Sequence, residues 1–196
     1  MRKLALLSLF VPAVAVAQPP PPPPPGYGPP APGYGQAPVN NKSGLTFEAN
    51  LGIGFIWAAA DGQESDKEVA LGGLNIGLGG WLSQQLAISF RIAGVTYSED
   101  VGDETARLST GFVGPSAQYW VNENAWLGGG VGLGFIALSF DGETESETGI
   151  GLDLRAGYTF STASENTWNV SFEFTPSSIE DTNFYGFGIL FGYQHL

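Results

Sequence analysis

The sequence predicts an all-β fold: an eight-stranded antiparallel up-and-down transmembrane β-barrel that follows a disordered, proline-rich N-terminal segment. Three observations carry this prediction. Residues 44–196 alternate apolar with small or polar residues, which is the period of a β-strand. Short polar clusters divide this stretch, and the connections that they form alternate between long and short. Glycine and charged residues share the face opposite to the apolar one, which places the apolar face outside a narrow barrel.

Residues 1–17 have the pattern of a signal peptide. Arg2 and Lys3 precede an apolar run over 4–10, and small residues follow at 15–17. This order predicts cleavage after Ala17. A membrane anchor is the alternative, but the run falls short of the roughly 18 apolar residues that a spanning helix needs. The chain has no cysteine, so lipid attachment at a cysteine beside the cleavage site is not expected.

A linker is expected over 18–43, because residues 18–38 hold most of the 14 prolines of the chain together with two GYG units. Such a segment buries no core and is extended polyproline II, with a rise of about 3.1 Å per residue. Two roles stay open for it. It is a tether that contacts a periplasmic partner or the cell-wall polymer, or it is a passive spacer, which is the favoured interpretation.

Eight stretches have strand periodicity and form the expected barrel domain, residues 44–196. The first shows the pattern: Leu45, Phe47 and Ala49 lie on one face, and Thr46 and Glu48 lie on the other. The expected strands are 44–58, 70–80, 86–98, 107–121, 125–140, 148–160, 167–175 and 183–196.

The connections between these strands fall into two classes. Three are short, at 83–85, 122–124 and 161–166, and the others are longer and acidic, at 59–69, 99–106, 141–147 and 176–182. Barrels of the bacterial outer membrane have short periplasmic turns and longer extracellular loops, and an even strand number places both termini in the periplasm. The expected location is therefore the bacterial outer membrane, with both termini periplasmic.

A soluble barrel of the lipocalin or avidin type is the alternative, and it would turn its apolar face inward. Its outer face would then be rich in glycine, as at Gly128, Gly130 and Gly132, which does not suit a water-facing surface. Strand alternation places Trp81 and Trp126 on the inward face, so these two rings do not fit a lipid-facing position. Aromatic residues near the strand ends favour a membrane, because amphipathic rings are enriched at its interfaces: Trp57, Tyr97, Phe140 and Tyr185 at the loop ends, and Trp81, Tyr119, Trp120, Trp126, Phe160 and Trp168 at the turn ends.

A near-balanced set of charged residues has inward parity: Glu48, Arg91, Asp153, Arg155 and Glu173. The interior of an eight-stranded barrel is only wide enough for side chains to fill, so these residues are expected to pair and to plug the barrel. A register that places Phe160 opposite Trp168 also places Arg155 opposite Glu173, and their charged groups are expected to meet.

The signal peptide, the eight alternating strands and the final strand GFGILFGYQHL (186–196) resemble the small OmpA/OmpX-type outer-membrane β-barrels. This group is also called porin-family or opacity-like barrels, and the resemblance covers about residues 44–196. It implies outer-membrane lipid, lipopolysaccharide and the barrel assembly machinery as partners. The chain departs from the group by ending at Leu196 rather than at an aromatic residue.

Little in the sequence points to catalysis or to a cofactor. The formal net charge of −12 argues against nucleic-acid binding. His195 is the only histidine, and the absence of cysteine removes disulfides and thiol nucleophiles. The glycines of 128–134 form no complete dinucleotide-binding motif. No cofactor is expected, although catalysis by paired carboxylates stays formally open.

The acidic loops are candidates for weak Ca²⁺ or Mg²⁺ binding, because hard cations prefer oxygen ligands. No EF-hand spacing is present, and solvated acidic loops are the more expected case. The weak candidate ligands are Asp61, Asp66, Asp103, Glu104, Asp141 and Glu143.

The sequence thus favours a non-enzymatic outer-membrane barrel that contributes to envelope integrity or contacts external partners through its acidic extracellular loops. A lipid A-modifying barrel enzyme is one alternative, which the resemblance to eight-stranded barrels implies. A narrow diffusion channel is the other alternative.

Overall fold

The computed structural model describes residues 42–102, 104–160 and 165–196. The expected signal peptide (1–17) and nearly all of the expected linker (18–43) lie outside these residues. No helix in the described ranges is long and apolar enough to cross a membrane. The strands of the described chain are β1 Leu45–Ala60, β2 Gln63–Glu64, β3 Glu68–Trp81, β4 Leu86–Val101, β5 Glu104–Trp120, β6 Ala125–Phe140, β7 Glu143–Thr159, β8 Asn166–Ile179 and β9 Thr182–His195.

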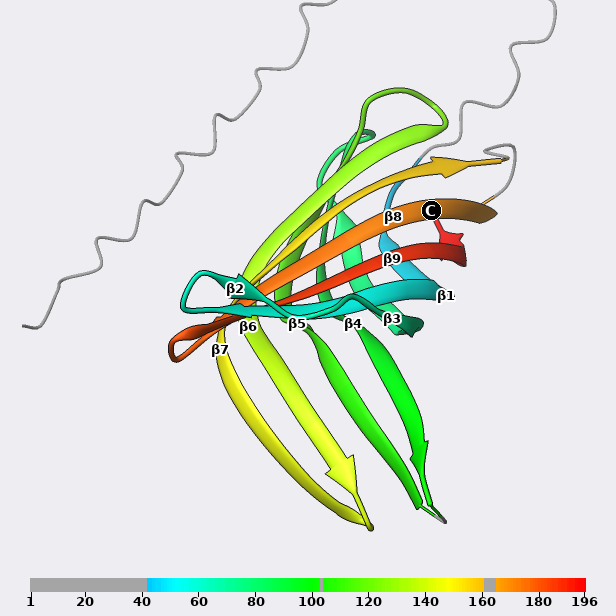
Figure 1. The fold of residues 1–196 in the computed structure, drawn as a ribbon. Coiled ribbons are helices and arrows are strands. Elements are labelled where there is room, and N and C mark those ends of the chain that lie inside the picture. The colour runs from blue at the N-terminus through cyan, green and yellow to red at the C-terminus, as the bar shows by residue number, and fades with distance from the viewer. Residues whose placement is uncertain (1–41, 103, 161–164) are drawn as a thin grey trace, which may run out of the picture. The chain divides into compact units, whose positions relative to one another are not determined.

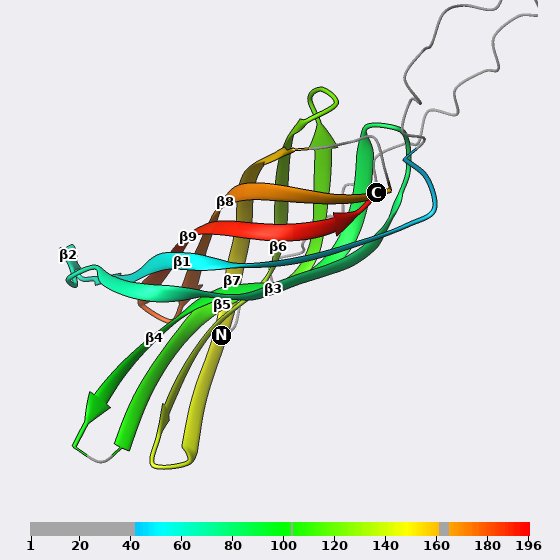
Figure 2. The same ribbon diagram turned by 90° about the vertical axis from the view of Figure 1, so that its right-hand side faces the viewer.

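The eight long strands form a closed antiparallel barrel, as Figure 1 and Figure 2 show. Each long strand pairs with the next one along the chain, and β1 also pairs with β9, which closes the barrel. The short β2 pairs with the end of β1. Closure removes the free sheet edges that an open sheet would expose. The predicted fold class is therefore confirmed for the described residues.

The burial pattern is the reverse of that in a water-soluble protein. Large apolar side chains cover the outer surface, such as Leu45 with 73% of its area exposed and Ile150 with 70%. The buried side chains are mostly polar or charged, and Arg91 is fully buried. Glycine makes room for them, since a Cβ atom added to Gly128 would lie 2.5 Å from Nε of Arg155. An apolar surface around a packed polar interior suits a barrel that stands in lipid.

A β-bulge in β3 changes which side chains face the interior. The register of β3 shifts against β1 between Asn50 and Gly52, and it shifts against β4 between Gly72 and Ile76. An extra residue in one strand of a pair reverses the alternation of faces beyond it. As a result, Asn75 is buried inside the barrel.

The four connections predicted as long acidic loops are β-hairpins with tight turns or short turn regions, so this part of the prediction is wrong. Only Asp141 and Gly142 separate β6 from β7. Both residues have positive φ angles, as do Asp61 and Gly62 after β1. This is the geometry of two-residue hairpin turns that match the twist of the strands. The acidic residues therefore lie largely in or beside paired strands.

Two hairpins, β4–β5 and β6–β7, extend side by side beyond the closed barrel (Figure 1, Figure 2). In the described chain, β3 pairs with β4 as far as Thr96, and β8 pairs with β7 as far as Ile150. Pairing between β5 and β6 continues farther, to Arg107 and Ser139. These four strands form an extension that we call the projecting sheet, residues 97–101, 104–109 and 135–149.

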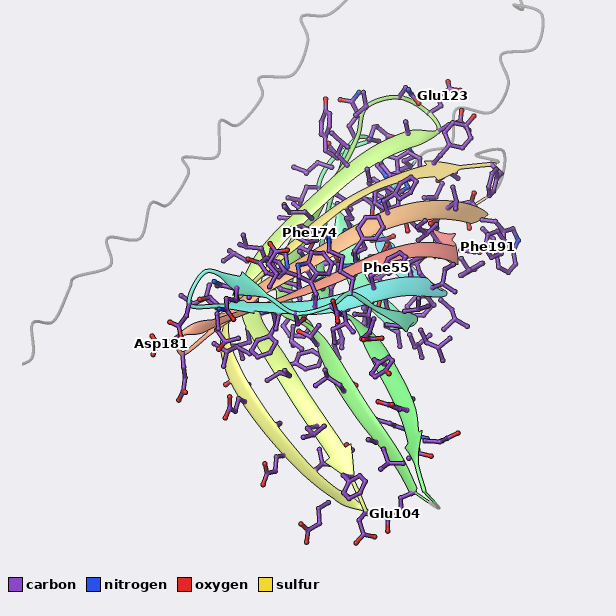
Figure 3. All side chains as sticks on the ribbon, viewed as in Figure 1. Phe55, Glu104, Glu123, Phe174, Asp181 and Phe191 are labelled. Atoms are coloured by element: carbon purple, nitrogen blue, oxygen red, sulfur yellow. The ribbon has the colours of Figure 1, made fainter. Side chains whose placement is uncertain are left out.

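The two ends of the barrel differ. Lys42 and Leu196, the first and last described residues, lie at the same end as the connection between β5 and β6, and we call it the terminus end. The hairpin tips that follow β1, β4, β6 and β8 lie at the other end, the hairpin end. Figure 3 shows Glu123 at the terminus end and Glu104 and Asp181 toward the hairpin end.

Candidate functional site

Charged side chains in the middle of the barrel form one ion-pair cluster. Arg91 on β4 pairs with Glu48 on β1, with Asp153 on β7 at 3.2 Å and with Glu173 on β8 at 2.7 Å. Arg155 on β7 pairs with Glu48 at 2.6 Å and with Asp153 at 3.5 Å. These distances join guanidinium nitrogens to carboxylate oxygens. The structure thus buries all five inward charges and gathers them in one place.

The expected contact between Arg155 and Glu173 is replaced by a different pairing. β7 and β8 have the expected register, with Arg155 opposite Glu173. However, Arg155 donates to Glu48 on β1, and Glu173 accepts a hydrogen bond from Arg91 on β4. The reason is the narrow interior, across which a long side chain reaches a distant strand as readily as the adjacent one.

Two neutral side chains complete the ion-pair cluster, and the charge pattern alone does not identify them. Asn75 donates through Nδ2 to Oε1 of Glu173 at 2.8 Å. Ser116 donates through Oγ to Oδ2 of Asp153 at 3.0 Å and accepts from Arg155 at 3.2 Å. Strand parity places Ser116 inside, whereas Asn75 faces inward because of the bulge. The consecutive glycines before Asn75 are the sequence signal for that bulge.

The terminus end of the interior is filled by aromatic rings and by the side chain of Lys42. Trp120 and Trp126 are almost fully buried and pack with Leu196 and Trp81. Nζ of Lys42 lies 3.2 Å from the centroid of the Trp120 ring, which is a cation–π contact. Trp120 therefore lies inside the barrel rather than at the lipid interface. We call these five residues the tryptophan lid.

Lys42 occupies an unusual environment for an ammonium group. Burial lowers the pKa of Lys42 from 10.5 to about 8, and the nearby carboxylate of Glu123 opposes part of this effect. The buried charges of the described residues balance when Lys42 is protonated, since three carboxylates face two guanidinium groups and one ammonium group. Lys42 thus contributes the charge that makes the described interior neutral.

The lowered pKa of Lys42 predicts a pH dependence of stability. Between about pH 8 and pH 10.5 the folded protein releases this proton while the unfolded chain keeps it, so stability rises with pH in this window. We expect the urea midpoint to increase from about pH 7 to about pH 10 more in the wild type than in Lys42→Met, whose side chain does not titrate. An equal increase in both proteins would contradict the lowered pKa.

Apolar side chains pack together at the hairpin end of the interior. Ile56, Ala70 and Val95 are buried there, and Tyr97 and Leu108 pack against them. A hollow with room for about one water molecule separates this apolar cluster from the ion pairs. The described interior therefore has three successive layers: the tryptophan lid, the ion-pair cluster and the apolar cluster.

The weak metal-ligand candidates do not come together. Asp103 lies outside the described residues. Among the described residues, no group of three or more histidine, cysteine, aspartate or glutamate side chains is placed to hold a metal ion. His195 lies at the terminus end, with Nδ1 3.0 Å from Oδ1 of Asn166. The remaining candidates are spread over three hairpins: Asp61 and Asp66 between β1 and β3, Glu104 at the start of β5, and Asp141 and Glu143 at the tip of β6–β7.

A family model described as outer membrane protein beta-barrel domain matches residues 30–194, which is most of the chain. The chain belongs to the outer membrane protein beta-barrel family. Membership of this family places the protein in the bacterial outer membrane. No curated protein matches its sequence significantly.

Two of the solved structures that share the fold of this outer-membrane barrel match it over most of its length. One is Ail, the attachment invasion locus protein of Yersinia pestis, with a TM-score of 0.54 and 18% identity over 76% of this chain and 98% of Ail. The other is Neisserial surface protein A, with a TM-score of 0.53 and 14% identity over 77% of this chain and 96% of that protein. At these identities the likeness concerns the fold alone.

Tryptophan rings stack on aromatic neighbours in two clusters on the outside of this outer-membrane barrel. In one cluster, Trp57 stacks on Phe174 and on Tyr185, toward the hairpin end. In the other, at the terminus end, Trp168 stacks on Phe191 with their ring centroids 5.3 Å apart. Amphipathic rings favour the interfaces of a membrane. The two clusters therefore mark the expected limits of the lipid-embedded zone.

Proposed function

We propose that this protein is a closed, non-enzymatic barrel that presents acidic β-hairpins to the cell exterior and contacts external partners through them. The projecting sheet carries this proposal, because it is a paired four-stranded extension whose acidic residues stand beyond the closed barrel. Surface segments held by a rigid scaffold commonly provide binding residues. In this proposal the short turns, both chain termini and the tryptophan lid face the periplasm.

The packed interior favours a closed barrel over a diffusion channel. The tryptophan lid, the ion-pair cluster and the apolar cluster follow one another along the interior. An ion that passed through would have to separate buried charges from their partners, which is costly. In this proposal the ion-pair cluster stabilises the barrel instead of guiding a solute.

The placement of polar groups favours binding over catalysis. His195 stands at the terminus end, opposite to the acidic hairpin tips, whereas a lipid A-modifying barrel enzyme needs its histidine toward the outer leaflet.

In this proposal outer-membrane lipid contacts the apolar surface, lipopolysaccharide surrounds the hairpin end, and the barrel assembly machinery inserts the chain. In this proposal the linker 18–43 serves as a periplasmic spacer, with contact to the cell wall as the other role.

A polyanion is not the external partner that we propose. Ail was solved in complex with the heparin analogue sucrose octasulfate. The projecting sheet of this protein carries several exposed carboxylates, among them Glu143, Glu145 and Glu147. Like charges across an interface disfavour binding, so a cationic partner fits this surface better.

Cysteine labelling tests the proposed orientation. The chain has no cysteine of its own, so single replacements at exposed Thr144 in the projecting sheet and at exposed Glu123 at the terminus end report on the two sides. A maleimide that does not cross the membrane should label Thr144→Cys on intact cells, and Glu123→Cys only after the outer membrane is opened. The opposite pattern would overturn the orientation, and steady ion conductance in planar bilayers would favour a channel.

A further inference from the structure

The inner face of the projecting sheet is an uncovered surface that is both apolar and acidic. The register between β6 and β7 continues without a shift from the barrel to the hairpin tip. The strand face that carries Asp153 and Arg155 inside the barrel therefore continues along the projecting sheet. Beyond the barrel it bears Ile136, Leu138 and Phe140 of β6 and Glu143, Glu145 and Glu147 of β7.

These residues form an apolar column directly beside an acidic column. Leu138 lies opposite Glu145, and Phe140 lies opposite Glu143. Opposite residues of an antiparallel pair have Cβ atoms about 5 Å apart, and residues of one column repeat about every 7 Å. Leu138 is 49% exposed and Phe140 is 45% exposed, so a ligand that covers them gains apolar burial.

The apolar column continues into the barrel. Leu138 lies opposite Leu108 of β5, and Leu108 packs with Tyr97 against the buried Val95. The exposed side chains of β6 are therefore not isolated apolar residues on a polar hairpin. They belong to a continuous strip that runs from the apolar cluster toward the tip of the projecting sheet.

The acidic column forms no ion pair among the described residues. Their ion pairs belong to the interior cluster around Arg91 and Arg155. Arg107 of β5 lies opposite Ser98 and Ser139, and its parity places it on the other face of the sheet. Three like charges in one column repel one another, and a cationic ligand relieves this repulsion.

We propose that this inner face is a docking site for a cationic amphipathic peptide segment, with lysine or arginine in one column and apolar side chains in the next. An α-helix presents residues i and i+4 about 6 Å apart on one face, close to the repeat of about 7 Å along the strands. A small metal ion would leave the apolar column uncovered, and a purely apolar ligand would leave the glutamates unpaired. The inference rests on the proposed function, in which this face is open to the cell exterior.

Binding of a synthetic peptide tests the docking site. The probe is a fluorescent amphipathic helix of lysine and leucine, and the purified barrel is held in phosphatidylcholine nanodiscs, with empty nanodiscs as background. Glu143→Gln/Glu145→Gln/Glu147→Gln should weaken binding about tenfold at low salt. The matched control Asp61→Asn/Glu64→Gln/Asp66→Asn removes the same charge from exposed positions of another hairpin and should weaken binding less than about threefold.

A second variant tests the apolar column without a change of charge. Leu138→Thr/Phe140→Thr should weaken binding of the amphipathic helix about fivefold, and a peptide of the same composition in scrambled order should bind wild type and variant equally weakly. A shift in gel mobility on heating verifies that each variant is folded. No binding above empty nanodiscs, or equal losses from the two charge triples, would overturn the docking site. Labelling of Thr144→Cys on intact cells is independent, so a labelled barrel that binds no peptide refutes the docking site and leaves the proposed function standing.

Discussion

Replacement of Arg91 by leucine is expected to destabilise the barrel by about 3 to 5 kcal/mol, the usual cost of removing one partner from a buried ion pair. Arg91 contacts Glu48, Asp153 and Glu173. Its loss leaves three carboxylates in the interior cluster with Arg155 as the remaining guanidinium group. The free energy of unfolding is measured by urea titration in lipid vesicles. The folded fraction at each urea concentration is read from the difference in gel mobility between heated and unheated samples.

A double-mutant cycle separates the pairing of Arg91 from a general loss of packing. Arg91→Leu together with Glu173→Leu should destabilise by less than the sum of the single effects, because the double replacement removes both charges. The same cycle between Arg155 and Glu173 should give a smaller coupling, since Arg155 pairs with Glu48. A larger coupling for Arg155 than for Arg91 would support the pairing that strand register alone suggests and would contradict the observed one.

Strand alternation predicts which side chains point inward, but it does not predict their partners. Glu48 and Arg91 were expected inside because side chains alternate between the faces of a strand, and both are buried. Alternation contains no information on how far a side chain reaches across the interior. The pairing of Arg155 with Glu48 on a distant strand therefore required the three-dimensional structure.

Other features depend on details that the alternation hides. Asn75 reaches Glu173 because a bulge reverses the faces of β3. Residues 99–101, 104–106 and 141–147 of the projecting sheet stand beyond the barrel, where polar residues suit both faces of a strand, so these segments have the composition of loops. The Asp141–Gly142 turn was the available signal for a tight hairpin. Lys42 precedes the first strand, where no periodicity exists, so its position over Trp120 follows from tertiary packing.

Valine at Gly52 is expected to prevent closure of the barrel. Gly52 lies opposite Leu190 of β9, at the seam where the first and last long strands meet. A Cβ atom at this position would lie 2.8 Å from Cα of Leu190 and would overlap the carbonyl group of Ile189. Overpacking typically costs about 1 to 3 kcal/mol, and here backbone rather than a flexible side chain must move. We therefore expect a loss of about 3 kcal/mol or more, or failure to fold.

Gly129→Val in β6 is the matched control for this seam. A Cβ atom at Gly129 would meet the carbonyl oxygen of Asp153 at 3.4 Å, which is ordinary contact, and valine favours strands more than glycine does. After refolding into lipid, Gly129→Val should keep the heat-sensitive gel band that we expect of the wild-type barrel, and Gly52→Val should lack it. Equal refolding of both variants would show that the seam tolerates a side chain, and that close approach of β1 and β9 at Gly52 is not what permits closure.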